Sequence, residues 1–215
     1  MRQIRLILVI AAAALATVAI GALRLARPAP ARALTPDLNM DMLSIPEFAL
    51  TSQDDAPVTR ADLLGRVTIL DFFFTSCPFI CPPMSRNMKR CQDALAGTGV
   101  RFLSMSVDPA HDNPERLRAY ADEVGADTDS WTFATGDRAI VSRILTDGLL
   151  LAAPVEDPRQ KITLETGATT PNILHPSRFI LIGPHAEVIS LTNGLNREQV
   201  DALIARARAA AHELN

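Results

Sequence analysis

The cysteine pair Cys77 and Cys81 carries the most reactive side chains of this sequence, and it follows a long apolar run. Two prolines after Cys81 begin a helical pattern, so Cys81 should lie just outside the helix N-terminus and Cys77 in the loop before it. One helical turn between them would bring their Cα atoms to about 6 Å, within reach of a disulfide. A helix N-terminus favours thiolate, which is both the nucleophile and the metal ligand. The pair predicts a redox couple, a soft-metal site, or both.

The spacing of the pair favours function over structure. A disulfide that closes so short a loop constrains the unfolded chain little. The Cys-x-x-x-Cys spacing is wider than the Cys-x-x-Cys of disulfide exchangers, and it suits a metal held by both sulfurs. Thiolates select Cu(I), and an added imidazole makes a site that can also hold Cu(II).

His175 is the candidate for that imidazole, because it stands where a long loop meets a strand. It follows Cys81 by 175 − 81 = 94 positions, so only the fold can bring it to the pair. The competing histidines lie in a polar loop, in a hairpin turn and near the C-terminus: His111, His185 and His212.

Three other residues near the pair have competing interpretations. Cys91 is ten residues beyond Cys81, about 15 Å along a helix, and falls on the apolar stripe, so we predict a core residue. Met84 offers a soft sulfur but also fits the core. Asp71 lies within the strand before the site, where a carboxylate could assist proton transfer at a thiol or bond a nearby backbone group.

The elements that must position these residues alternate between strands and helices. The patterns predict a short edge strand at 45–50, strands at 67–74, 100–107, 131–134, 178–182 and 187–191, and helices after residues 81, 113, 137 and 196, with a long loop at 154–174. This order indicates an α/β domain with a central mixed sheet flanked by helices. A cysteine pair at the end of the first long strand is where thioredoxin-like folds keep their chemistry.

The N-terminal segment predicts attachment to a membrane. Residues 6–23 form an uncharged apolar run preceded by Arg2 and Arg5, so we expect residues 1–27 to span the inner membrane once and the remainder to face the periplasm. The alternative is a signal peptide that is cut after the Ala-x-Ala pattern Ala31-Arg32-Ala33. Residues 28–44 then form a Pro/Ala-rich linker, and 45–215 form one domain. The net charge of −3 gives no indication of nucleic-acid binding.

Four segments, in this order, resemble the Sco/SenC family. Residues 74–82 resemble its Cys-x-x-x-Cys-Pro signature, and residues 106–109 with 112–115 resemble its S-V-D-P…D-T-P-E segment. Trp131 with Thr135-Gly136 is similar to its W…L-T-G, and residues 175–182 to the strand that carries its histidine ligand. The resemblance covers residue 45 to the C-terminus.

The resemblance implies a thioredoxin-like fold and copper bound by Cys77, Cys81 and His175. It also implies a role in building the copper centre of cytochrome c oxidase, with a copper-accepting oxidase subunit or another exported copper protein as partner. Two positions depart from the family pattern, since Phe79 and Leu174 stand where many members have acidic residues. Such departures bear on copper affinity and on partner identity.

Three functions follow from these residues. The first is a membrane-anchored copper chaperone. The second is a periplasmic thiol–disulfide oxidoreductase, which reduces partner cysteines before metallation and needs only a redox-active Cys77–Cys81 pair. The third is a thiol peroxidase, which is disfavoured because Phe74 occupies the threonine position of the usual Thr-x-x-Cys arrangement.

Overall fold

Strand β3, Thr68–Phe73, is the centre of the sheet, and all six of its residues are buried. In the computed structural model, which describes residues 33–164 and 166–214, it pairs in parallel with β4 on one side and antiparallel with β8 on the other. A nearly continuous apolar run is what a strand covered on both faces requires. The predicted strand 67–74 is therefore confirmed.

The main sheet is mixed and has the order β2-β1-β5-β4-β3-β8-β9. Its other strands are β1 Ala49–Ser52, β2 Pro57–Thr59, β4 Arg101–Ser106, β5 Trp131–Thr135, β8 Arg178–Ile182 and β9 Val188–Asn193. The helices are α2 Cys81–Ala94, α3 Pro114–Glu123, α4 Arg138–Arg143 with its π-helical continuation η3 Ile144–Gly148, and α5 Arg197–Leu214; short 3-10 turns are η1 Met40–Met42 and η2 Arg60–Leu63.

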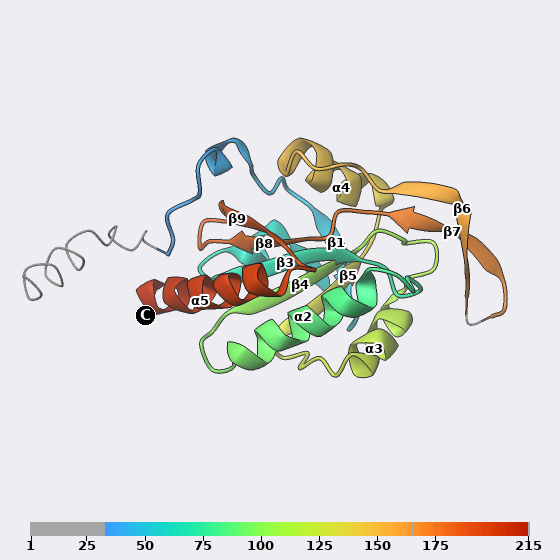
Figure 1. The fold of residues 1–215 in the computed structure, drawn as a ribbon, viewed down its shortest axis with the longest axis horizontal. Coiled ribbons are helices and arrows are strands. Elements are labelled where there is room, and N and C mark those ends of the chain that lie inside the picture. The colour runs from blue at the N-terminus through green and yellow to red at the C-terminus, as the bar shows by residue number, and fades with distance from the viewer. Residues whose placement is uncertain (1–32, 165, 215) are drawn as a thin grey trace, which may run out of the picture. The chain divides into compact units, whose positions relative to one another are not determined.

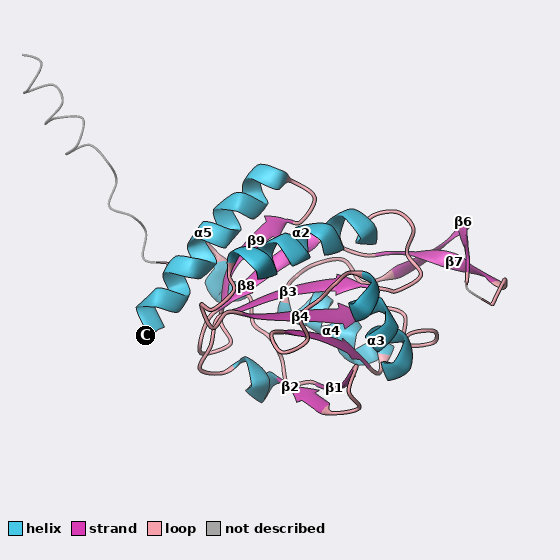
Figure 2. Cartoon of the chain, turned by 90° about the horizontal axis from the view of Figure 1, so that it is seen from below, coloured by secondary structure: helices cyan, strands magenta, loops and turns pink. Residues whose placement is uncertain are grey.

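Helices α2, α3 and α5 cover one face of the sheet, whereas α4 and the segment before β1 cover the other (Figures 1 and 2). The arrangement follows from chain handedness, because β3-α2-β4 and β4-α3-β5 are consecutive parallel crossovers and right-handed crossovers place both helices on one side. Between α3 and the sheet, Phe73, Tyr120 and Phe133 form an aromatic cluster with ring centroids 5.2–6.0 Å apart.

The helix boundaries follow the predicted caps. Asn113 accepts a hydrogen bond from the Arg116 N–H at the start of α3, and Asp137 accepts one from the Ala139 N–H at the start of α4. Before α5, the Asn196 side chain accepts from the Gln199 N–H. Each cap satisfies a backbone donor that the first helical turn leaves free.

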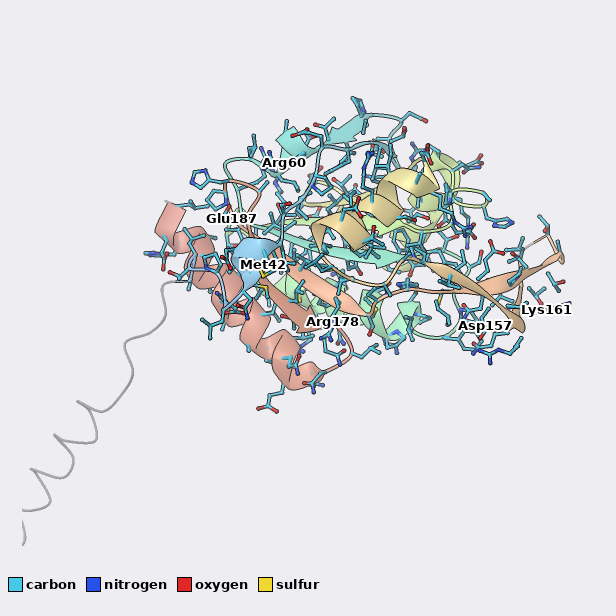
Figure 3. All side chains as sticks on the ribbon, turned by 90° about the horizontal axis from the view of Figure 1, so that it is seen from above. Met42, Arg60, Asp157, Lys161, Arg178 and Glu187 are labelled. Atoms are coloured by element: carbon cyan, nitrogen blue, oxygen red, sulfur yellow. The ribbon has the colours of Figure 1, made fainter. Side chains whose placement is uncertain are left out.

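Two predicted elements were wrong. Residues 154–174, predicted as a loop, form the hairpin of β6 Val155–Thr163 and β7 Thr169–Leu174, which projects from the body of the domain and carries Asp157 and Lys161 (Figures 1 and 3). Most of its side chains are exposed, so no alternating apolar pattern marks it. The strand predicted at 45–50 is β1 at 49–52; it pairs on both sides, and the edge belongs to β2.

The N-terminal part of the chain is described from residue 33 onward. The predicted membrane segment at 1–27 lies outside the described residues. The described part of the predicted linker packs on the domain, since the Arg206 guanidinium donates to the Ala33 carbonyl and to Asp37, and the Asp37 N–H donates to the Ile189 carbonyl. Within residues 33–164 and 166–214, none of the helices combines the length and apolarity needed to cross a membrane.

Candidate metal centre

The cysteine pair lies where β3 gives way to α2. The Cys77 N–H donates to the Phe74 carbonyl at 3.3 Å, which closes a turn directly after the strand. Cys81 is the first residue of α2 and Ile80 takes the cap position, so the prediction that Cys81 lies just outside the helix was wrong by one residue. Proline biases the preceding residue away from helical geometry without forbidding it. Pro82 is tolerated because first-turn N–H groups have no intrahelical partner.

His175 reaches the pair from the other half of the chain. It stands between β7 and β8, and its Nε2 lies 3.5 Å from the Cys81 Sγ. The ligand atoms of Cys77, Cys81 and His175 all lie within 4.8 Å of one another, and this is the single group of three His, Cys, Asp or Glu residues suited to a metal among the described residues. A late first-row metal holds sulfur and nitrogen at about 2.0–2.3 Å, so small side-chain movements suffice to close the three around one ion.

The imidazole of His175 is held by its surroundings. Its ring meets the buried Phe74 ring edge-on at 5.8 Å and 78°, and its Nδ1 lies 3.4 Å from the Pro176 carbonyl oxygen. A hydrogen bond from Nδ1–H to that carbonyl would leave the Nε2 lone pair facing the sulfurs, which is the tautomer that a metal needs.

The two thiols of the pair differ in acidity. A hydrogen bond from Cys81 stabilises the Cys77 thiolate and, against the effect of burial, lowers the pKa of Cys77 well below that of an ordinary thiol. Burial, together with the adjacent Cys77 sulfur, raises the pKa of Cys81 well above the ordinary value. At neutral pH the pair therefore carries one thiolate, on Cys77, and one proton, on Cys81.

Asp71 is buried beneath the pair and is bound by a side chain rather than by the backbone. The Ser104 hydroxyl donates to its Oδ1 at 2.5 Å, and the Trp131 Nε1–H donates in turn to the Ser104 oxygen at 2.9 Å. Burial, partly offset by the Ser104 hydrogen bond, raises the pKa of Asp71 to about 7. A carboxyl group that titrates near neutrality below a buried thiol is suited to exchange a proton with it.

We expect Asp71→Asn to change how stability depends on pH. Between about pH 4 and 7, native Asp71 keeps a proton that the unfolded chain has released, so the wild-type free energy of unfolding falls as pH rises through this window and levels off above it. Asparagine removes this contribution. The free energy of unfolding of the variant, measured relative to that of the wild type, should therefore rise by about 3 kcal/mol from pH 5 to pH 8. Denaturant unfolding at both pH values measures the change.

The matched control for this prediction is Asp122→Asn, at an exposed aspartate on α3. Its pH profile should run parallel to that of the wild type. A profile of Asp71→Asn that also runs parallel to the wild type would contradict the raised pKa.

Asp112 was not among the functional residues predicted from sequence, although its carboxylate helps to position the loop that carries Cys77. It accepts hydrogen bonds from the Thr75 N–H at 3.2 Å, the Thr75 hydroxyl at 2.6 Å and the Ser106 hydroxyl at 2.5 Å. Thr75 also accepts from the Arg116 Nε–H, so this network fixes the chain two residues before Cys77. The sequence signal that could have identified Asp112 is the polar segment that follows β4. Because β3 and β4 are parallel, this segment lies at the same end of the sheet as the loop that follows β3.

The remaining candidates are placed elsewhere in the core or on the surface, and Met84 is one turn of α2 beyond Cys81. Cys91 and Met84 are buried on the inner side of α2 as predicted, and all three cysteines are free thiols. The Nδ1 of His111 pairs with the Asp108 carboxylate at 2.8 Å. His185 is exposed in the turn between β8 and β9, and His212 lies near the end of α5.

Comparison with known proteins identifies the family to which this chain is similar. A family model described as SCO1/SenC matches residues 38–211. The SCO1 protein homolog of Bacillus subtilis is 30% identical over 167 residues, which are 76% of this chain and 81% of the relative.

Solved structures share the fold. One is the structure of BsSco, a member of the Sco family of cytochrome c oxidase assembly proteins in which a disulfide switch was identified. Its TM-score is 0.64 at 30% identity, and the match covers 79% of this chain and 94% of that one. The structure of ScoI from Bradyrhizobium japonicum with copper bound has a TM-score of 0.59 at 23% identity, over 77% of this chain and 99% of that one.

Proposed function

Because the chain belongs to the SCO1/SenC family, we propose that it is a copper chaperone that binds one copper ion through Cys77, Cys81 and His175. The observation that carries the proposal is the convergence of these three side chains within 4.8 Å. The donor set fits copper, because two thiolates select Cu(I) and the imidazole extends the site to Cu(II).

Delivery is the second part of the proposal. The acceptor is the copper-binding subunit of cytochrome c oxidase or another exported copper protein, in line with the assembly role named for BsSco. Cysteines of the acceptor would replace Cys77 and Cys81 one at a time, so the ion is never released to water. Residues 1–27 would anchor the chain in the inner membrane with the domain in the periplasm, as the uncharged apolar run and the preceding arginines suggest.

Metal analysis of the reduced full-length protein tests the binding. We expect one copper ion per chain after loading with Cu(I) under reducing conditions, retained through desalting. Copper below a tenth of stoichiometry would overturn the chaperone proposal.

The affinity for copper should depend on pH through one proton. Copper binding needs both sulfurs as thiolates, and only Cys81 still carries a proton at neutral pH. The apparent affinity should therefore rise about tenfold per pH unit between pH 7.5 and 9. Competition with a thiol-free Cu(I) chelator of known affinity measures the slope. A flat profile would show that both sulfurs are already ionised, and a hundredfold rise per unit would show that both are protonated.

Thiol–disulfide exchange is a second candidate function, and the unequal acidity of the pair favours it. The Cys77 thiolate would attack a partner disulfide and form a mixed disulfide, and Cys81, after losing its proton, would displace the partner thiol. The partner gains two thiols and this chain keeps a Cys77–Cys81 disulfide. A measured reduction potential beside the copper titration separates the functions: a reductase transfers electrons to partner disulfides without copper, whereas a pure chaperone does not.

A further inference from the structure

Exposed apolar side chains gather around the metal centre. Nine large hydrophobic side chains of the described residues are strongly exposed, and four of them flank the site. We call these four the apolar rim: Phe79, Val155, Leu174 and Leu195. Their exposed fractions are 50%, 58%, 46% and 41%, respectively. Single exposed hydrophobics are ordinary, but a group around a functional centre indicates an interaction surface.

Three rim residues lie close to the metal ligands, two of them along the chain and the third through strand pairing. Phe79 lies two residues from each cysteine, in the loop between them. Leu174 immediately precedes His175 and ends β7, where it pairs across the hairpin with Val155. Cross-strand partners in an antiparallel pair share one face, so these two side chains form one exposed apolar contact at the base of the hairpin.

Leu195 joins the rim from the connection between β9 and α5. It follows Gly194, whose N–H donates to the Ser177 carbonyl at 3.0 Å, two residues after His175. The Gly194 carbonyl accepts from the Asn87 side chain of α2 at 2.7 Å. These bonds hold the connection between the histidine loop and the helix that begins with Cys81.

The sulfurs inside the rim are difficult to reach. Cys77 is 6% exposed and Cys81 is 1% exposed. Ligand exchange requires donor atoms of the acceptor to come within bonding distance of the ion that these sulfurs hold. A protein acceptor that does so must lie against the surrounding side chains.

We propose that the apolar rim is the docking surface for the copper-accepting protein, and that the acceptor presents an apolar surface around its own metal-binding cysteines. The inference rests on the proposed function and adds the chemistry by which the partner is recognised. Burial of apolar area depends little on ionic strength, whereas docking between charged surfaces weakens as salt screens them. Transfer to the correct acceptor should therefore be nearly insensitive to salt.

The test measures copper transfer from the full-length protein, loaded with Cu(I), to a purified copper-accepting domain of cytochrome c oxidase. The rim variants are Val155→Asp and Leu195→Asp, which lie farther along the chain from any ligand; Phe79 and Leu174 are left unchanged, because an acidic residue at either position bears on copper affinity itself. Leu64→Asp is the matched control, because Leu64 is similarly exposed at 44% but precedes β3, at the strand end opposite the site. Copper stoichiometry and extraction by a small chelator are measured for every protein.

We expect each rim variant to bind copper and lose it to the small chelator like the wild type, but to transfer it to the protein acceptor about tenfold or more slowly. Leu64→Asp should transfer at the wild-type rate, and the wild-type rate should change less than about twofold between low and physiological salt. Normal transfer by both rim variants, or steep salt dependence, overturns the docking proposal while leaving copper binding intact.

The same variants can also reveal whether something other than the copper acceptor binds the apolar rim. If the rim variants dissociate a wild-type dimer, a second copy of this chain covers the rim. If they weaken binding to neutral phosphatidylcholine vesicles without slowing transfer, the rim contacts lipid. Either result overturns the acceptor assignment, and absence of copper from the wild type overturns the proposed function itself.

Discussion

Cys81→Ser is expected to abolish stoichiometric copper binding, and Cys77→Ser is expected to do the same. Loss of groups that only orient a metal ligand costs 10–100-fold in affinity, so loss of a ligating thiolate should cost about a thousandfold or more. Serine keeps the size of the side chain but offers no thiolate to Cu(I). Copper per chain after desalting, together with chelator competition, measures the loss.

The two cysteine variants should differ in their remaining thiol. A serine hydroxyl can replace the Cys81 thiol as a donor to the Cys77 sulfur, so the matching test is Cys81→Ala, which removes the donor and should raise the pKa of Cys77 from its lowered value. Cys77→Ser removes the neighbouring sulfur that, after burial, raises the pKa of Cys81, so the pKa of Cys81 should fall. Alkylation rates measured from pH 4 to 10 report both changes.

Cys91→Ala is the matched control for both variants. It also removes one thiol, but Cys91 is buried on α2 outside the ligand cluster. This variant should keep one copper per chain and lose only core stability. Wild-type copper content in Cys77→Ser or Cys81→Ser would exclude a two-thiolate site.

The position of the cysteine pair could be predicted from sequence because its determinants are local. The apolar run that becomes β3 and the prolines after Cys81 fix a strand, a turn and a helix start within about fifteen residues. The buried stripe of α2 repeats at helical spacing, which also identified Cys91 as a core residue. Local patterns of this kind need no knowledge of the rest of the fold.

The position of His175 beside the cysteine pair could not be derived from local sequence patterns, because the order of the strands in the sheet determines it. Strand β3 pairs antiparallel with β8 so that the two residue numbers of each pair add up to 250, as for Leu70 and Ile180. Continued beyond the strands, this register places residue 250 − 75 = 175 opposite Thr75. Only family resemblance could supply that strand order in advance.

The β6–β7 hairpin escaped prediction for a different reason. Sequence periodicity reports the contrast between a buried face and an exposed one. Ile162 and Ile173 are buried, but most of the other side chains on this hairpin are exposed on both faces. With so little contrast, the segment has the pattern of an irregular loop although its two strands are paired over most of their length.

His175→Ala should lower copper affinity by about a hundredfold or more while leaving both thiols in place. The imidazole is the third donor of the set, and its Nε2 already lies 3.5 Å from the Cys81 sulfur. A two-thiolate site would still hold Cu(I) weakly, but it would lose Cu(II), for which the nitrogen ligand is needed. Chelator competition for Cu(I) and the visible absorption of the Cu(II)-loaded protein measure the two effects separately.

This variant distinguishes the chaperone from the reductase, because thiol–disulfide exchange needs the sulfurs alone. If copper transfer is the function, His175→Ala should lose copper while its cysteine pair still forms and reduces a disulfide. His185→Ala, at an exposed turn histidine, controls for the loss of an imidazole elsewhere on the surface. Unchanged Cu(I) affinity and Cu(II) absorption in His175→Ala would leave a two-sulfur site, and the closeness of the ring to Cys81 would then serve thiol chemistry instead.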